Sequence, residues 1–332
     1  MSLGKSSFVI SIPKSWLRSN DLQKGDRVYL DVHNDGSLVI HPLFEEREQD
    51  REIHIPIDPT EADSSIERKI IGAYLDGYTR IKLSSGKIFN SDQQRAIRSI
   101  VSTLYMMIIE SEASIIVLQT LIDESKASVT TSINRMHLIT YAMCRDLLSV
   151  LNSRDIELAQ SVLSLENDVD QLMFFILRLI RSAVLSPSLC TKLNLDPLDC
   201  LDYQTLVHRI ERVADHCTSI AESLIHLIES GIDIPGPVHD ILKSAADITF
   251  TAYNNSVGGF DEKDVTSTND LIDTEKKIEE LLKGITPLPQ LGEISFLADI
   301  ISIRESLKKI NHYTADIAEL TIDRAYKYSG ES

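Results

Sequence analysis

The spacing of hydrophobic residues changes along this chain. Up to about residue 43, apolar and polar positions alternate over short runs separated by turn signals, whereas from about residue 128 apolar residues recur every three or four positions over long stretches. Alternation is typical of half-buried strands, and a spacing of three and four is typical of amphipathic helices. The pattern predicts a small β-rich beginning and a long helical remainder.

The first region, residues 4–43, has the pattern of a small β unit. A strand is predicted over residues 7–12, a short helix after Pro13, and two strands over residues 28–32 and 38–41. The turn Asn34-Asp35-Gly36-Ser37 between the last two is a strong hairpin signal. Because a unit of this size is too small to be stable alone, we expect dimerisation to complete its core.

The second region, residues 50–122, alternates strand and helix patterns. Strands are predicted over residues 52–57, 80–83 and 114–118. Helices are predicted over residues 64–74, with Ser64 or Ser65 as the cap, and over residues 91–109. This β-α-β-α-β order predicts a small α/β unit.

The third region, from about residue 126, is predicted to be helical. The helices are expected over residues 128–151, 155–185, 202–230, 238–255, 266–283 and 294–328. A loop is predicted over residues 186–201, which hold Pro187 and Pro197, and breaks are predicted at Gly258-Gly259 and Pro287-Leu288-Pro289.

The six helices divide into two trios, which indicates an internal repeat. Near the end of the third helix of each trio, Ile220-Ala221-Glu222 matches Ile317-Ala318-Glu319.

Acidic residues occur at helical spacing in the first trio. Glu211 and Asp215 stand one turn apart, and so do Glu166 and Asp170 on the preceding helix. Like charges at this spacing cost a few tenths of a kcal/mol, and two such pairs on neighbouring helices could hold a cation between them. The alternative is a solvated helix face that nearby arginines neutralise.

Composition limits the class of protein. At 332 residues the chain is expected to hold two or three domains, and its low aromatic content, 6%, favours helical packing. The four cysteines show no metal-binding spacing and are expected to be reduced thiols. No apolar run reaches the length of a membrane span and no signal peptide is evident, so the expected location is the cytoplasm.

The charge of the chain is unevenly distributed. The net charge of −17 lies almost entirely after residue 43, because the region before it balances five basic residues against four acidic ones. Basic side chains of this region could position it on DNA phosphates, although a unit that only dimerises is the alternative. The candidate DNA-binding residues are Lys5, Lys14, Arg18, Lys24 and Arg27.

The helix that starts near residue 202 resembles the third helix of the PhoU family. It carries Arg-Ile-Glu-Arg-Val-Ala-Asp-His over residues 209–216, followed by Ile220-Ala221-Glu222, and residues 166–172 resemble the acidic motif of that family's second helix. The resemblance implies a metal site on oxygen ligands, suited to a divalent or trivalent ion such as Fe, Mg, Mn or Ca. Its ligands would be Glu166, Asp170, Glu211 and Asp215.

The N-terminal sequence resembles the AbrB/SpoVT swapped-hairpin DNA-binding domain. The resemblance rests on residues 7–14, Ser-Phe-Val-Ile-Ser-Ile-Pro-Lys, and on Leu22-Gln23-Lys24-Gly25-Asp26. With residues 68–78 between, the whole is similar to the archaeal AbrB-PhoU architecture, although only three residues precede Gly4, where that domain normally has a strand. The implied domains are residues 1–46, 47–125, 126–232 and 233–330.

Together these features predict a mainly α fold. Two PhoU-like three-helix repeats would follow a small AbrB-like β domain and a small α/β linker domain. The implied function is regulation of phosphate uptake by a homodimer that binds DNA, with a phosphate ABC transporter or a signalling protein as a further partner. One alternative is a docking scaffold that does not touch DNA. The other is a metal-dependent enzyme, which is disfavoured because the chain has no helical Glu-x-x-His pair and no P-loop.

The second trio departs from the acidic pattern. Alignment of the two Ile-Ala-Glu motifs puts Lys308 opposite Glu211 and His312 opposite Asp215. A lysine opposes cation binding, so a full second site is not expected. Asp273, Glu275 and His312 remain candidates for a partial one.

Overall fold

The computed structural model describes residues 10–32, 36, 38–42, 51–285 and 294–327. The chain forms two compact units, one of residues 1–50 with 328–332 and the other of residues 51–327. None of the described helices contains an apolar stretch long enough to cross a bilayer.

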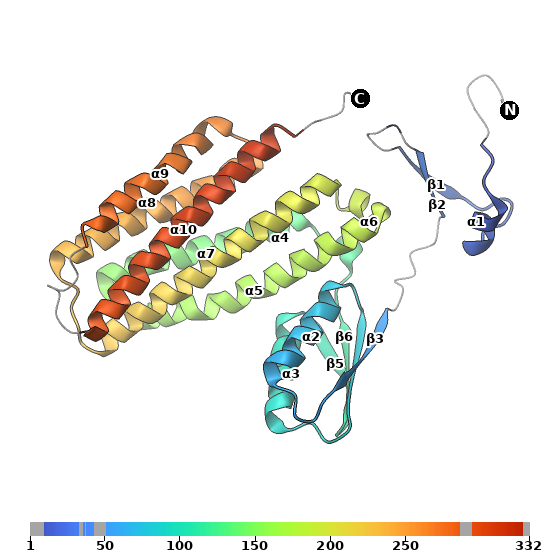
Figure 1. Ribbon diagram of the computed structural model, residues 1–332, viewed down its shortest axis with the longest axis horizontal. Coiled ribbons are helices and arrows are strands. Elements are labelled where there is room, and N and C mark those ends of the chain that lie inside the picture. Colours follow the sequence, from blue (N-terminus) through green and yellow to red (C-terminus); the bar gives the residue numbers. More distant parts are fainter. Residues whose placement is uncertain (1–9, 33–35, 37, 43–50, 286–293, 328–332) are drawn as a thin grey trace. The chain divides into compact units, whose positions relative to one another are not determined.

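The first unit holds a short helix, α1 (Lys14–Ser19), and an antiparallel hairpin of β1 (Val28–Val32) and β2 (Leu38–Pro42) (Figure 1). The predicted helix and hairpin are confirmed, with Pro13 as the N-cap residue of α1. Most of the strand predicted over residues 7–12 and of the turn over residues 34–37 lies outside the described residues; the described part of that strand, residues 10–12, is not in a sheet.

The second unit begins with an α/β module. Its elements are β3 (Glu52–Ile57), α2 (Asp63–Leu75), β4 (Arg80–Ser85), α3 (Ser91–Thr103), β5 (Met106–Ser111) and β6 (Ile115–Thr120). The sheet order is β3-β4-β6-β5, with β3 parallel to β4 and β6 antiparallel to both of its neighbours. Ile81 and Leu83 of β4 are buried while the residues beside them are partly exposed, so α2 and α3 cover one face of the sheet.

Two predictions for the module are wrong. The helix expected over residues 91–109 ends at Thr103, and the remainder forms the unpredicted strand β5. The apolar run from Met106 to Ile109 continues the helical spacing, but Tyr105 adopts a positive φ of 50° and ends the helix. The cap of α2 is Ala62, without a side-chain hydrogen bond, rather than Ser64 or Ser65.

A helical bundle follows the short 3₁₀ turn η1 (Glu124–Lys126). Its helices are α4 (Val129–Ser153), α5 (Ile156–Leu185), α6 (Pro187–Lys192), α7 (Pro197–Glu229), α8 (Gly236–Glu262), α9 (Val265–Lys283) and α10 (Ile294–Ala325). Ser128, Asp155 and Asp196 cap the starts of α4, α5 and α7 with side-chain oxygens that accept backbone N–H groups.

The loop predicted over residues 186–201 is wrong. It contains α6 and the first turn of α7, because Pro187 and Pro197 occupy first-turn positions, where a missing N–H costs nothing. The break predicted at Gly258-Gly259 is also wrong, since α8 continues to Glu262 and the buried Gly259 lies beside Thr268 of α9. The break predicted at residues 287–289 lies outside the described residues.

The bundle consists of the two predicted trios, α4-α5-α7 and α8-α9-α10 (Figure 1). The third helices, α7 and α10, pack against each other and join the trios around one hydrophobic core. Ile220, Ala221, Ile317 and Ala318 are all at most 1% exposed, so the two matching motifs have equivalent buried positions.

A buried arginine joins the α/β module to α5. The Arg178 side chain is 2% exposed, and its Nε donates to Glu124 Oε1 at 2.6 Å. Nη1 donates to the carbonyl oxygens of Tyr74, in the last turn of α2, and of Tyr78, just after that helix. The guanidinium lies 4.8 Å from the centre of the Tyr74 ring. On the next turn, Arg181 pairs with Asp76 at the surface.

Candidate functional site

The packing of α5 against α7 brings the four predicted metal ligands together. Glu166 and Asp170 lie on α5, and Glu211 and Asp215 lie on α7. The carboxylate of Asp215 repels those of Glu166 and Asp170 electrostatically, and Glu211 is repelled by both Asp215 and Asp170. We call these four residues the acidic cluster.

Burial and mutual repulsion raise the pKa of three members of this cluster. Burial, followed by the charges of Asp215 and Asp170, raises the pKa of Glu211 to about 7, with Arg212 acting in the opposite direction. Burial, with Glu166 and Asp215, raises the pKa of Asp170 to about 6. Burial, followed by the charge of Asp215, also raises the pKa of Glu166. Asp170 and Glu211 therefore change their protonation state near neutral pH.

The positive charge of Arg212 partly compensates the negative charge of the acidic cluster. Its Nη1 donates to Asp215 Oδ2 at 3.0 Å, and its Nε lies 3.5 Å from Glu211 Oε2. Across the described ranges 51–285 and 294–327, no three Asp, Glu, His or Cys side chains converge in a way that could hold a metal ion. The acidic cluster thus brings negatively charged side chains near one another, but they are not arranged as a preformed metal site.

The sequence-based prediction missed Glu222, whose charge also raises the pKa of Glu166. The signal was available, because Glu222 follows Asp215 by two helical turns and so faces the same way.

His216 lies at the contact between α7 and α10, where its Nδ1 is 3.3 Å from Ser306 Oγ and its ring stacks on Tyr313.

A stability measurement would test the protonation of the cluster. A carboxyl group whose pKa is higher in the folded state than in the unfolded chain opposes folding once it is ionised. We therefore expect stability to fall as the pH rises from about 4.5 through about 7, the range between the ordinary and folded pKa of Glu211. Glu211→Gln should reduce this loss by roughly 1–3 kcal/mol, measured by urea unfolding at pH 5 and pH 8 in metal-free buffer.

Glu229→Gln, at the exposed end of the same helix, is the matched control. It should leave the pH dependence unchanged. Equal curves for wild type and Glu211→Gln would contradict the proposed repulsion.

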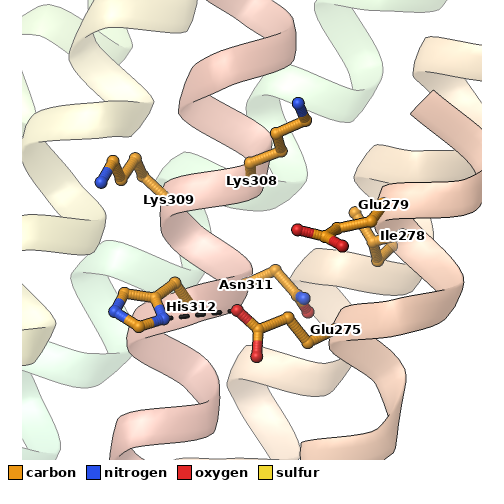
Figure 2. Close-up of a pocket in the computed structure, with 7 residues that line it drawn as sticks. All are labelled: Glu275, Ile278, Glu279, Lys308, Lys309, Asn311 and His312. Atoms are coloured by element: carbon orange, nitrogen blue, oxygen red, sulfur yellow. Dashed lines mark hydrogen bonds and ion pairs between the residues drawn. The ribbon is translucent and has the colours of Figure 1, made fainter. Parts of the chain in front are cut away.

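The equivalent position of the second trio has a mixed charge. A cavity of about 210 Å³ lies between α9 and α10, with Glu275 and Glu279 on one wall and Lys308, Lys309 and His312 on the other (Figure 2). His312 Nδ1 lies 3.3 Å from Glu275 Oε1. Two of the three candidates for a partial site thus meet, and Asp273 is not among the lining residues.

The first unit exposes basic side chains, and its described side chains do not form a buried core. Lys14 and Arg18 are exposed and share a face of α1, one turn apart, and Lys24 and Arg27 are exposed before β1; Lys5 lies outside the described residues. No residue of this unit whose exposure is described is buried, and Ile10, Leu30 and Leu38 are 56%, 51% and 48% exposed. Trp16 of α1 is half-buried.

Comparison with known proteins connects these regions to two families. Residues 133–224 match the PhoU domain model, and residues 2–49 match the model described as antidote-toxin recognition MazE, bacterial antitoxin. Among curated protein sequences, no match to the chain was found.

The bundle is similar to two solved structures. The crystal structure of PhoU from Pseudomonas aeruginosa is 19% identical with a TM-score of 0.51, and the match covers 58% of this chain and 93% of that one. The phosphate transport system regulatory protein PhoU from Streptococcus pneumoniae is 16% identical with a TM-score of 0.51, covering 61% of this chain and 96% of that one. These similarities confirm the predicted fold of the helical region.

Proposed function

We propose that this chain, in which residues 133–224 form a PhoU domain, is a cytoplasmic regulator of phosphate uptake that acts by binding DNA. The observation that carries the proposal is the joining, in one chain, of a PhoU-like bundle to a small unit that exposes basic side chains and matches an antitoxin model. The Streptococcus relative is a regulatory protein of a phosphate transport system, which supports a regulator rather than an enzyme.

Dimerisation through the first unit is part of the proposal. A two-stranded hairpin is marginally stable alone, and the exposed Ile10, Leu30 and Leu38 are the apolar side chains that a second copy would cover. A dimer would also double the number of basic side chains facing the phosphates. Because the remainder of the chain is strongly acidic, DNA contact is confined to this unit.

Salt-dependent binding to a mixed-sequence DNA duplex tests the DNA contact. The wild-type chain should bind at low salt, and Lys14→Glu with Arg18→Glu should weaken binding by at least about 100-fold. If a dimer loses four phosphate contacts, the slope of log K against log salt should fall by roughly 3 to 4. Fluorescence anisotropy gives the slope, and light scattering on the same samples gives the mass.

Lys243→Glu, on an exposed position of α8, is the control for net charge and should leave binding nearly unchanged. Absence of binding by the folded wild-type chain at low salt would favour the scaffold alternative, in which the bundle docks onto the phosphate transporter or a signalling protein. Binding that resists both charge reversals would reject Lys14 and Arg18 as the contact residues.

We further propose that a hard cation, Mg, Mn, Ca or Fe, binds the acidic cluster. The carboxylate donors suit such ions, and a cation would relieve the repulsion that raises the pKa of Asp170 and Glu211. Because Arg212 now contacts Asp215 and Glu211, it would have to release them. The residues that would hold the ion are Glu166, Asp170, Glu211 and Asp215.

Thermal unfolding with each chloride salt measures this binding. An ion at 100 times its Kd should stabilise the chain by about 2.7 kcal/mol. Asp170→Asn with Glu211→Gln should abolish the gain, whereas Glu275→Gln in the second trio should retain it. An equal gain in all three proteins would place the ion elsewhere.

A further inference from the structure

The four cysteines of the chain form two close pairs. Cys144 of α4 and Cys217 of α7 have their Sγ atoms 3.6 Å apart. Cys190 of α6 lies within hydrogen-bonding reach of Cys200 in the first turn of α7. All four are reduced thiols, and the Cys144–Cys217 separation is longer than the roughly 2.05 Å of a disulfide bond.

The turn between α6 and α7 brings the second pair together. The Leu195 N–H donates to the Cys190 carbonyl oxygen at 3.0 Å, and Cys190 Sγ lies 3.1 Å from Leu195 O. Asn194 makes this reversal with a positive φ of 55°. Asp196 then caps α7, and Cys200 N–H donates to the Asp196 carbonyl oxygen at 3.0 Å. The short connection therefore holds the Cys190 thiol against the start of α7.

The two pairs differ in their access to solvent. Cys144 and Cys217 are both 0% exposed and lie in the hydrophobic core. Cys200 is 1% exposed, but Cys190 is only partly buried. A small oxidant can thus reach the second pair through Cys190, whereas the first pair is sealed while the chain is folded.

We propose that Cys190 and Cys200 are a reversible disulfide site that hydroperoxides oxidise. With hydrogen peroxide, the Cys190 thiol loses its proton and the thiolate sulfur attacks one peroxide oxygen. The S–O bond of a sulfenic acid forms, the O–O bond breaks, and the hydroxide that leaves takes up the proton to become water. The Cys200 sulfur then attacks the Cys190 sulfur, the S–O bond breaks, and a second water leaves. Two thiols lose two electrons and two protons, and one hydrogen peroxide becomes two waters.

The burial of Cys200 and the partial exposure of Cys190 indicate which cysteine reacts with the peroxide and which forms the disulfide bond. Burial, together with the neighbouring Cys190 thiol, raises the pKa of Cys200 to about 12, so Cys200 is rarely a thiolate in the reduced protein. The more exposed Cys190 therefore meets the peroxide first, and Cys200 resolves the sulfenic acid.

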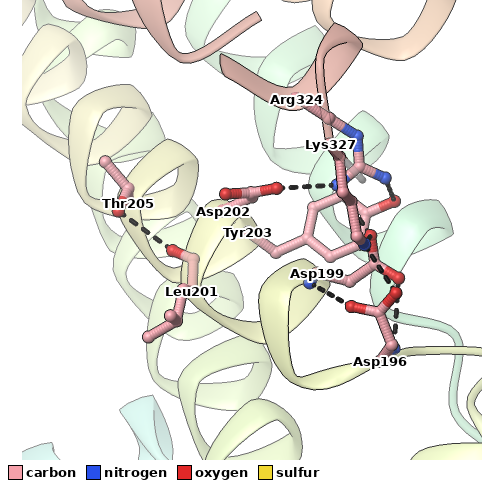
Figure 3. Close-up of polar contacts among 8 residues, drawn as sticks. All are labelled: Asp196, Asp199, Leu201, Asp202, Tyr203, Thr205, Arg324 and Lys327. Carbon is pink, nitrogen blue, oxygen red and sulfur yellow. Dashed lines mark hydrogen bonds and ion pairs between the residues drawn. The ribbon is translucent and has the colours of Figure 1, made fainter. Parts of the chain in front are cut away.

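The disulfide would stiffen a turn that holds the end of α10. Asp196, between the two cysteines, pairs with Lys327 at 2.6 Å, and Asp199 accepts from Arg324 at 2.9 Å (Figure 3). Oxidation therefore acts on the contacts that anchor α10 to the start of α7.

The test uses the full chain, folded and initially reduced, treated with increasing hydrogen peroxide. After the remaining thiols are alkylated, digestion and mass spectrometry should find Cys190 linked to Cys200, with a mass loss of two hydrogen atoms that dithiothreitol reverses. Cys144 and Cys217 should stay alkylatable only after unfolding.

Single cysteine-to-serine variants distinguish oxidation of Cys190 from formation of the disulfide bond, and a variant outside the pair serves as the control. Cys190→Ser changes a partly exposed position and should abolish the intramolecular disulfide, whereas Cys144→Ser should leave it intact. Cys200→Ser should trap a sulfenic acid on Cys190 that dimedone labels. The proposal is overturned if peroxide leaves both thiols reduced, if Cys190 oxidises without linking to Cys200, or if the Cys144–Cys217 bond forms first.

Discussion

Replacement of Arg178 by methionine is expected to destabilise the chain by about 3–5 kcal/mol, because it leaves the buried partners of a desolvated cation without their donor. The variant loses the 2.6 Å contact to Glu124, two hydrogen bonds to carbonyl oxygens and the contact with the Tyr74 ring. Methionine keeps much of the length of the side chain, so the loss is mainly polar. Urea unfolding, followed by far-UV circular dichroism, measures it.

Arg181→Met is the matched control. It lies one turn away on α5 and also pairs with a residue at the end of α2, but Arg181 and Asp76 are 51% and 56% exposed. An exposed pair contributes at most about 1 kcal/mol. Equal losses for the two variants would show that the burial of Arg178 is not what makes it important.

The second large effect is expected at Arg324, where Arg324→Met should cost about 2–4 kcal/mol. Its guanidinium lies 4.8 Å from the centre of the Tyr203 ring and 5.0 Å from that of Phe260, and it pairs with Asp199 and Asp202 (Figure 3). Those carboxylates are 18% and 19% exposed, so removal of the cation leaves them repelling each other. Thermal and urea unfolding measure the loss.

Arg304→Met provides the comparison for Arg324. Arg304 is also on α10 and 18% exposed, but within the described part of the chain its ion pair is with its neighbour Glu305, which is 48% exposed. A loss below about 1 kcal/mol is expected there. Hydrogen exchange at the start of α7 should increase in Arg324→Met alone. Unchanged exchange would mean that the network does not hold the two helix ends together.

The sequence pattern located elements well where local signals and tertiary packing agree. The hairpin of β1 and β2 and the helices α4 and α5 follow from alternation, caps and long amphipathic periods. The pattern failed at β5, because Met106 to Ile109 is a short apolar run that suits a helix or a strand equally. The pattern also failed at α8. Two adjacent glycines favour a break, but here the helix continues through them and the backbone of Gly259 packs beside Thr268 of α9.

The acidic cluster could be predicted only in part. Spacing showed that Glu166 with Asp170, and Glu211 with Asp215, share helix faces, but only the packing of α5 on α7 shows that the two pairs repel each other. Arg178 could not have been recognised, because its partners lie more than fifty residues away in the sequence and two of them are backbone carbonyl groups.

The two trios also share an interior pattern while their charged positions differ. Both keep a buried Ile-Ala pair at the same place in the third helix. The aligned positions before that pair carry Glu211 and Asp215 in one trio and Lys308 and His312 in the other. The interior packing of a trio and its charged positions can therefore differ independently within one polypeptide. Each trio is an internal reference for the other, because equivalent buried positions accompany two different sets of charges.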